Sequence, residues 1–242
     1  MLVKNCPVVD ERNLTAVCPG YTVNAMLGDH QVSDELERER RYWREHRSAQ
    51  VSAGSLARIA DAVLQWHTRH DSGLELGCGE GMLLPLLPGA VGIDSALPGL
   101  RVAEVKHALV TCADSTGLPF DTARFSYVVT NSLHHMPLER SLAEVRRVLA
   151  PGGRFYCTEP NRWHPYRLLG GRGTGGEIVG DTGFFPYRLA ASCRRQGFTV
   201  ESVVPITLEI EPITWRSRLQ RMIGRIPVSC CQSWFLLIAS RR

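Results

Sequence analysis

Leu74-Glu75-Leu76-Gly77-Cys78-Gly79-Glu80-Gly81 is the stretch that decides the fold of this chain. It joins the end of a short apolar segment to the start of a stretch with helical spacing. Its glycines allow the backbone to take positive φ and to approach a ligand closely. In an open α/β sheet, a ligand held by such a loop lies beyond the carboxyl end of a strand.

The spacing of the glycines distinguishes two kinds of ligand. A dinucleotide loop has the spacing GxGxxG, but here the third glycine comes one residue early and Met82 takes the position of the last glycine. A pyrophosphate site also has no need of an acid directly before the loop, where this chain has Glu75. A carboxylate there suits a ligand that carries an ammonium and a sulfonium group. The pattern therefore disfavours an NAD-dependent oxidoreductase.

Short apolar segments alternate with helical stretches along the rest of the chain, which indicates a parallel sheet covered on both faces. The expected strands are 73–76, 90–93, 109–112, 125–130 and 154–158, and the expected helices are 53–67, 81–87, 97–105 and 138–149. Near the C-terminus we expect helices at 187–196 and 215–223 and strands at 198–205 and 233–239. The predicted fold is α/β: a doubly wound, Rossmann-like, mostly parallel seven-stranded sheet with an antiparallel C-terminal edge and an N-terminal helical arm.

The domain organisation follows from the same patterns. Residues 1–50 are predicted to form an irregular arm and a charged helix at 37–47 that acts as a lid. Residues 51–242 form the main domain. Its glycine- and proline-rich segment 160–186 lacks periodicity and is expected to cover the substrate, because long loops in compact domains are commonly functional.

The composition excludes several classes of protein. The longest apolar run near the C-terminus, Trp234–Ala239, is too short to cross a bilayer, and no N-terminal signal pattern is present, so a cytoplasmic protein is expected. The eight cysteines include no CxxC pair and no metal-binding spacing with histidine. The formal charge of +4 is modest, and the basic stretch 216–225 has the spacing of a solvated helix face, so no nucleic-acid partner is expected. The oligomeric state is left open.

Polar residues stand at the ends of successive predicted strands. Asp94 and Ser95 follow the second strand, Asp114 and Ser115 the third, and Asn131 the fourth. A carboxylate at Asp94 is placed to accept hydrogen bonds from two ribose hydroxyls, and one at Asp114 to bind an adenine amino group. Any single one of them is also a common helix or turn cap. Together at one sheet edge, they favour a nucleoside site.

This ordered set resembles the class I methyltransferases, specifically the methyltransferase-11 type. The motifs that carry the resemblance are ELGCGEG, GID, ADSTGLPF, NSLHHMP and EVRRVLAPGGRFYCTEPN, within about residues 73–160. The resemblance implies S-adenosylmethionine as the cofactor and methyl transfer to a small-molecule acceptor. It assigns the methionine end of the cofactor to Glu75 and the backbone of the loop Gly77, Cys78, Gly79 and Gly81, the ribose to Asp94 beside Ser95, the adenine to Asp114 and Ser115, and the surroundings of the methyl group to Asn131 and Leu133. The family often has aspartate where Glu75 stands.

His134 and His135 are the candidate catalytic residues. A neutral imidazole at His134 has a pKa suited to accepting a proton from the acceptor, whereas the resemblance makes a structural histidine common at position 135. Glu159 at the end of the fifth strand either faces the substrate or anchors a loop. Residues 162–164 follow it and suit an aromatic or anionic substrate, or simply pack on the surface.

The implied reaction is an in-line displacement in which proximity and alignment supply much of the catalysis. A base is needed only if the acceptor must lose a proton. The alternative is a fold relative that binds S-adenosylmethionine without methylating, either as a cyclisation catalyst or as a non-catalytic partner. An RNA methyltransferase has less support, because no RNA-binding module is appended.

Overall fold

The structure is a computed structural model of the chain. It describes residues 50–68, 70–87, 89–96, 99–100, 103, 109–165, 183–206, 208, 210–211, 218, 222–223 and 229–242. All of these belong to one compact unit, residues 46–242. The expected arm and helix of residues 1–49, and most of the expected helices 97–105 and 215–223 and of the segment 160–186, lie outside the described residues.

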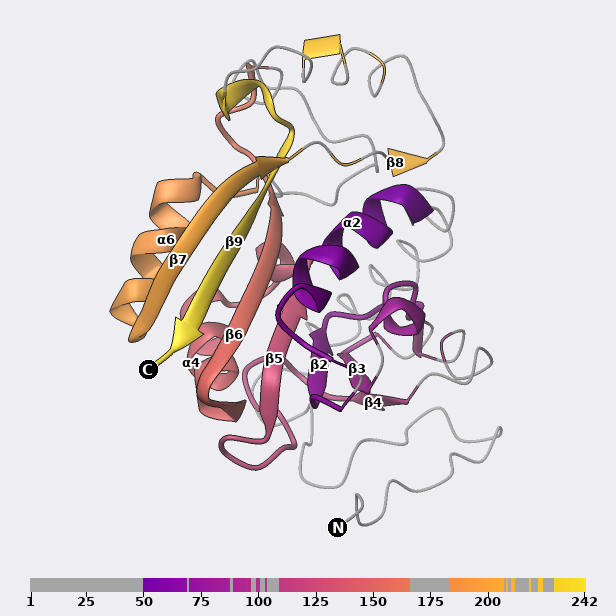
Figure 1. The fold of residues 1–242 in the computed structure, drawn as a ribbon, viewed down its shortest axis with the longest axis vertical. Coiled ribbons are helices and arrows are strands. Elements are labelled where there is room, and N and C mark those ends of the chain that lie inside the picture. The colour runs from indigo at the N-terminus through magenta and orange to yellow at the C-terminus, as the bar shows by residue number, and fades with distance from the viewer. Residues whose placement is uncertain are drawn as a thin grey trace, which may run out of the picture. The chain divides into compact units, whose positions relative to one another are not determined.

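A seven-stranded sheet forms the centre of the unit (Figure 1). Its strands, in spatial order, are β4 (Val110–Cys112), β3 (Ala90–Asp94), β2 (Gly73–Leu76), β5 (Phe125–Thr130), β6 (Leu149–Pro160), β9 (Trp234–Arg241) and β7 (Phe198–Ile206). The first five run parallel, whereas β9 is antiparallel to both β6 and β7. The predicted seven-stranded sheet with an antiparallel C-terminal edge is therefore confirmed.

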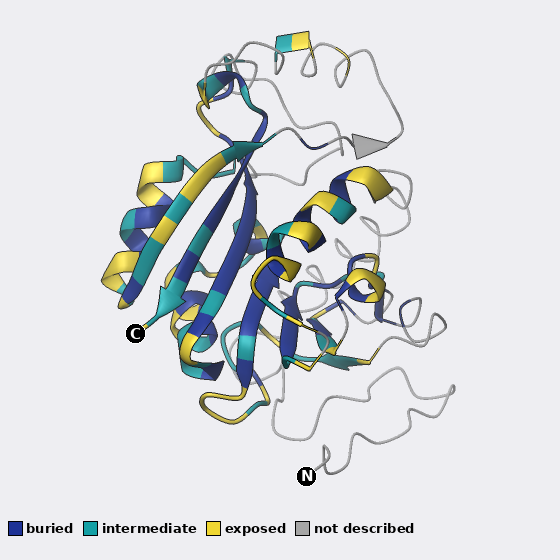
Figure 2. Ribbon diagram, viewed as in Figure 1, coloured by how far each residue is buried: buried dark blue, intermediate teal, exposed yellow. Residues whose placement is uncertain are grey.

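Helices cover both faces of the sheet, which explains why the central strands are mostly apolar. Helix α2 (Ala53–Leu64) packs on one face, and helices α4 (Leu138–Val148) and α6 (Pro186–Arg195) pack on the other. Alternate residues of β5 serve the two layers, since Val128 joins the core under α4 and α6 while its neighbours Tyr127 and Val129 join the core under α2. Figure 2 shows the central strands buried and the outer helix surfaces exposed.

The helix ends follow the local chemistry of the sequence. The Ser52 hydroxyl caps α2 by accepting a hydrogen bond from the Ser55 N–H at 3.3 Å. Helix α6 starts with Pro186 in its first turn, where a missing N–H costs nothing. Directly after its C-cap, Gly197 has φ +81°, as expected for a glycine that ends a helix. Helix α2 ends three residues before the predicted position 67.

The first residue of β2 is in close contact with a tyrosine of β5. Gly73 pairs with Tyr127 in the parallel ladder, and the phenol ring lies across the glycine. A Cβ atom at position 73 would lie 2.2 Å from Tyr127 Cζ. Tyr127 is completely buried and also stacks on His67 at a centroid distance of 4.8 Å. The absence of a side chain at position 73 is thus what admits this ring.

One predicted element is wrong, and one predicted strand is longer than expected. The helix expected at 81–87 is only the short 3₁₀ turn η2 (Leu84–Leu86), because Gly81 has φ +65° and Pro85 removes a backbone donor. Strand β6 begins at Leu149 instead of Arg154, since Leu149 pairs with Phe125 of β5 across a register shift. A small sheet between β1 (Gln50–Val51) and β8 (Ile210–Glu211) was not expected from the sequence. None of the described helices has the length and hydropathy needed to cross a membrane.

Candidate functional site

The loop after β2 requires its glycines for two reasons. Gly77, Gly79 and Gly81 have φ values of +74°, +51° and +65°, in the left-handed region that disfavours residues with a side chain. At Gly77 the space is also filled, because a Cβ there would lie 2.7 Å from the terminal carbon of Met136 and 2.9 Å from Ser132 Cβ. The loop therefore lies close against the segment that follows β5.

Asp94 ties this loop to the end of β3. Its Oδ2 accepts a hydrogen bond from the Gly79 N–H at 2.8 Å, and its Oδ1 accepts one from the Ala96 N–H at 2.8 Å. Burial raises the pKa of Asp94, although the backbone N–H groups oppose that rise. Each carboxylate oxygen has a second lone pair, so Asp94 can hold the loop and still accept hydrogen bonds from a ligand.

Glu75 is a buried acid on β2. Its side chain is only 3% exposed, and its Oε2 atom has no hydrogen-bond partner among the described residues. Burial, reinforced by the nearby charge of Asp94, raises the pKa of Glu75 well above the ordinary carboxyl value. Such a carboxyl is costly to ionise unless a cation or hydrogen-bond donor arrives. A ligand that carries an ammonium and a sulfonium group fits this site.

Replacing Glu75 by glutamine is expected to stabilise the ligand-free protein at alkaline pH. Because the pKa is raised in the folded state, ionisation of Glu75 lowers the stability of the wild-type protein as the pH rises through that raised value. Glu75→Gln should therefore melt above the wild type at about pH 8 and converge with it below about pH 4.3, the ordinary glutamate pKa. Each 1 kcal/mol corresponds to about 2–4 °C for a domain of this size.

The same substitution should weaken S-adenosylmethionine binding by about 10–100-fold, the loss typical of a charged hydrogen bond. Wild-type affinity should also rise with pH, because the bound cation favours ionised Glu75, and this rise should be absent in Glu75→Gln. Thermal melts and calorimetric titrations at both ends of the pH range measure the two effects. Asp61→Asn, on the exposed face of α2, is the control. Equal melting temperatures and equal affinities would contradict the assignment.

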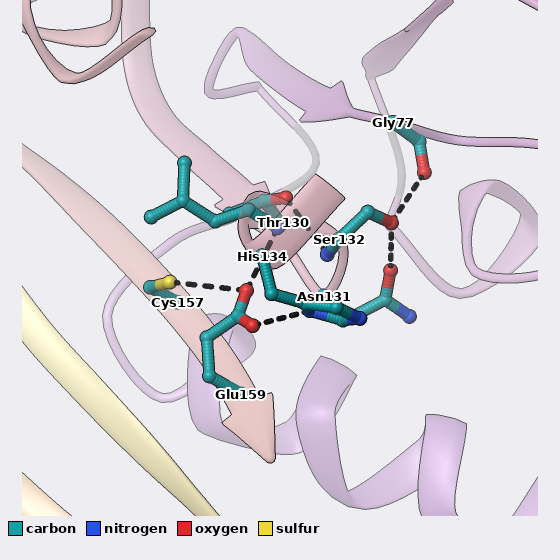
Figure 3. Close-up of polar contacts among 8 residues, drawn as sticks. Gly77, Thr130, Asn131, Ser132, His134, Cys157 and Glu159 are labelled. Carbon is teal, nitrogen blue, oxygen red and sulfur yellow. Dashed lines mark hydrogen bonds and ion pairs between the residues drawn. The ribbon is translucent and has the colours of Figure 1, made fainter. Parts of the chain in front are cut away.

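The ends of β4 and β5 meet the glycine loop and β3. The Ala113 N–H donates to the Asp94 carbonyl at 3.1 Å, which brings the end of β4 beside β3. The Ser132 hydroxyl lies 3.2 Å from the Gly77 carbonyl and 3.0 Å from Asn131 Oδ1. The end of β5 is thus linked to the loop after β2 (Figure 3). The strand ends that the sequence predicts to converge do lie together.

Several predicted cofactor residues have local partners. Asp114 is exposed, and its Oδ1 accepts hydrogen bonds from the Thr116 N–H and hydroxyl, each at 2.6 Å, as in a turn cap. The Ser115 hydroxyl lies 2.8 Å from that of Ser141 in α4. Both residues retain lone pairs for a ligand.

The structure also defines the surroundings of three other predicted cofactor residues. Leu133 is completely buried in the core and therefore does not line an open surface. The Cys78 side chain is also buried, and burial raises the pKa of its thiol, so it stays protonated. Ser95 is exposed, and its carbonyl lies 3.9 Å from Cys112 Sγ. Leu133 and Cys78 can face a cofactor only through their backbone.

An ion pair on α4 fixes the segment after Asp114. The Glu144 carboxylate accepts two hydrogen bonds from Arg147, at 2.7 and 2.8 Å, and a third from the Leu118 N–H at 2.7 Å. The guanidinium of Arg147 also donates to the carbonyls of Leu118 and Phe120 at 2.8 and 2.7 Å. This holds the apolar side of the expected adenine site against α4. The i,i+3 spacing of the two residues on a predicted helix is typical of an ion pair, but nothing in the sequence indicated their contacts with Leu118 and Phe120.

His134, in the segment that follows β5, forms a hydrogen bond with Glu159 at the end of β6 (Figure 3). His134 Nδ1 lies 2.5 Å from Glu159 Oε2, while Glu159 Oε1 accepts a hydrogen bond from the Leu133 N–H at 2.8 Å. Glu159 is completely buried, and the His134 side chain is 9% exposed. Of the two roles considered for Glu159, anchoring the loop after β5 is the one that these contacts show.

The surroundings of this pair are also defined. Cys157 Sγ lies 3.7 Å from Glu159 Oε1, and burial raises the pKa of this thiol, which excludes a nucleophilic thiolate there. The His135 ring is exposed and lies 4.0 Å from the His134 ring, centroid to centroid. The Glu159 carboxylate thus orients His134. Within the described part of the chain, no cluster of three or more histidine, cysteine or acidic residues is arranged to hold a metal ion.

Residues 74–157 match the family model described as a methyltransferase domain. One curated relative is an uncharacterized protein of Methanocaldococcus jannaschii, 37% identical over 91 residues, or 36% of each chain. The chain spans less than half the length of the curated relatives it matches, 36% and 46%.

Solved structures share the fold. A possible histamine N-methyltransferase from Thermotoga maritima superimposes with a TM-score of 0.56 and 15% identity, over 88% of this chain and 99% of the other. The [4+2]-cyclase SpnF superimposes with a TM-score of 0.53 and 21% identity, over 76% of this chain and 80% of the other. Relatives with this fold thus include proteins titled as methyltransferases and one titled as a cyclase.

Proposed function

We propose that the protein binds S-adenosylmethionine and transfers its methyl group to a small-molecule acceptor, as the match of residues 74–157 to the methyltransferase-domain family model supports. The observation that carries the proposal is the buried carboxyl of Glu75 near Asp94, whose Oε2 atom has no hydrogen-bond partner among the described residues. Glu75 and Asp94 are two acids in a largely buried site, which suits a ligand that is cationic and carries hydroxyl groups.

In this proposal, different residues bind the methionine, ribose and adenine parts of the cofactor. Glu75 and the backbone of Gly77–Gly81 hold the methionine end, and Asp94 accepts hydrogen bonds from the ribose. Asp114 and Ser115 bind the adenine edge, with the segment held by Arg147 against the ring. When bound, S-adenosylmethionine supplies an electrophilic methyl group that the acceptor attacks in line.

His134 serves as the proton acceptor in this proposal. Its Nδ1 faces the Glu159 carboxylate, so Nδ1 carries the hydrogen and Nε2 is the basic nitrogen. A proton leaving an acceptor hydroxyl or amine passes to Nε2, and the buried carboxylate stabilises the imidazolium that forms. The hydrogen bond from Leu133 N–H to Glu159 keeps the carboxylate in place while the charge develops.

Transfer of a labelled methyl group tests the proposal. The full chain is incubated with methyl-tritiated S-adenosylmethionine and panels of small acceptors, and label in the acceptor together with S-adenosylhomocysteine supports it. Cofactor binding with product formed but without label transfer would instead support a non-methylating fold relative. A chain that fails to bind S-adenosylmethionine at all would refute the proposed cofactor site.

A further inference from the structure

Three aromatic side chains gather where β6 leaves the sheet. Trp163, Phe185 and Tyr187, here termed the aromatic platform, have ring centroids 5.1, 5.9 and 6.3 Å apart in pairs. The side chains of Trp163 and Tyr187 are 42% and 55% exposed. Contiguous exposed aromatic surface is uncommon outside binding sites.

Two arginines accompany the aromatic platform. The guanidinium carbons of Arg162 and Arg188 lie 5.2 and 5.3 Å from the centre of the Phe185 ring, and that of Arg188 lies 6.0 Å from the Tyr187 ring. Neither arginine forms an ion pair with a described residue. The platform therefore combines flat apolar surface with two positive charges that no carboxylate of the described chain neutralises.

The backbone beneath the platform is held firmly, although its two halves are distant in sequence. The Arg162 N–H donates to the Phe184 carbonyl at 2.9 Å, and the Phe184 N–H donates to the Pro160 carbonyl at 3.0 Å. Gly183 permits this approach, since a Cβ there would lie 2.3 Å from the Pro160 carbonyl oxygen.

A buried asparagine completes this support. Asn161 Oδ1 accepts from the Trp163 N–H at 3.0 Å, and its amide donates to the carbonyls of Ser229 and Gln232 at 3.2 and 3.0 Å. Asn161 is only 2% exposed. The aromatic rings are thus presented from a fixed frame, which lowers the entropic cost of binding.

The platform also stands at the edge where the proposed chemistry takes place. Trp163 follows Glu159 by four residues, at the carboxyl end of the same strand, and Glu159 holds His134. We infer that the aromatic platform with Arg162 and Arg188 recognises the methyl acceptor, and that the acceptor is a planar aromatic acid, such as an aryl carboxylate that also carries the hydroxyl or amine group to be methylated. The inference rests on the proposed function, because it names the acceptor of that same site. The ring of the acid stacks on the exposed aromatic side chains while its anionic group pairs with the arginines.

Calorimetric binding of model compounds tests this inference without requiring turnover. The full chain is titrated with 1-naphthoate, with the neutral 1-naphthamide and with cyclohexanecarboxylate, which lacks the aromatic ring. The wild-type protein should bind 1-naphthoate at least about tenfold more tightly than either other compound, the factor expected for one charged contact or one stacked ring. The double variant Arg162→Gln/Arg188→Gln should lose the preference for the acid over the amide, and Trp163→Ala should weaken both aromatic compounds.

The controls separate this inference from the proposed cofactor site. Arg194→Gln, an exposed position of α6 outside the platform, should bind all three compounds as the wild type does. The affinity for S-adenosylmethionine should be the same in every platform variant as in the wild type. A wild-type protein that does not bind S-adenosylmethionine would refute the cofactor proposal but not the platform inference. Equal affinity for 1-naphthoate and 1-naphthamide, or unchanged binding in the double variant, would overturn the platform inference. The platform inference would also be overturned if a short RNA bound more tightly than 1-naphthoate and its binding weakened with salt.

Discussion

Replacing Asp94 by alanine is expected to lower the affinity for S-adenosylmethionine by about 100-fold or more. In the proposed site, two ribose hydroxyls lose a charged acceptor, and each such hydrogen bond contributes about 1.5–3 kcal/mol. The structure adds a second loss, because the same carboxylate accepts hydrogen bonds from the N–H groups of Gly79 and Ala96. Without it, the glycine loop loses the contact that holds it against β3.

The stability of Asp94→Ala should fall together with its affinity. Two backbone donors lose their acceptor, which costs about 1–3 kcal/mol for a group left unsatisfied, partly offset by relief of the repulsion on Glu75. The net decrease in melting temperature is expected to be about 2–4 °C per kcal/mol. Asp94→Asn keeps one carbonyl oxygen for the loop, so it should melt closer to the wild type yet still bind weakly.

The measurement separates the two losses. Calorimetric titration is carried out well below the melting temperature of each variant, so that weak binding is not unfolding. Asp61→Ala, on the exposed side of α2, should behave as the wild type. If folded Asp94→Ala binds S-adenosylmethionine as tightly as the wild type, the site assignment is wrong.

Loss of the His134 imidazole should reduce kcat by about 100- to 10,000-fold for an acceptor that must release a proton, the range typical of general-base catalysis. The affinity for S-adenosylmethionine should hardly change in His134→Ala, because the proposed role of this ring begins with the acceptor. Glu159→Gln should lower kcat by a smaller factor, since the histidine remains but loses the charge that orients it. The amide oxygen at position 159 can still accept the Leu133 N–H, which preserves the loop.

Steady-state kinetics with the acceptor found by label transfer checks this expectation. His135→Ala, which removes the exposed neighbouring ring, should have a smaller effect than His134→Ala and so distinguishes the two candidates. His70→Ala, at an exposed position before β2, serves as the unperturbed control. A full kcat in His134→Ala would show that alignment of the acceptor suffices without this base.

The sequence predicted the elements whose pattern is local. Gly73–Leu76 and Phe125–Thr130 were expected as strands with the bounds that the structure has, because short, mostly apolar runs bounded by polar residues are typical of buried parallel strands. Gly197, which follows the C-cap of α6, was also predictable, because a glycine at this position commonly ends a helix. The convergence of strand ends also followed, since it depends only on parallel order.

Other features depend on contacts between residues that are distant in the sequence. The early start of β6 arises from the pairing of Leu149 with Phe125. The role of Glu159 depends on a side-chain contact with a histidine 25 residues away. A clue was nonetheless present, because an acid at the end of an apolar strand is the same signal that identified Asp94. The helix expected after Gly81 was wrong because apolar spacing alone does not reveal a positive φ.

The contact of Gly73 with the Tyr127 ring has an evolutionary consequence. A methyl group at position 73 has no room while the ring is present, and a smaller residue at position 127 leaves a cavity beside the glycine. Either change alone is harmful, whereas both together restore the packing. Positions 73 and 127 should therefore covary among homologues, because selection favours paired replacements over single ones.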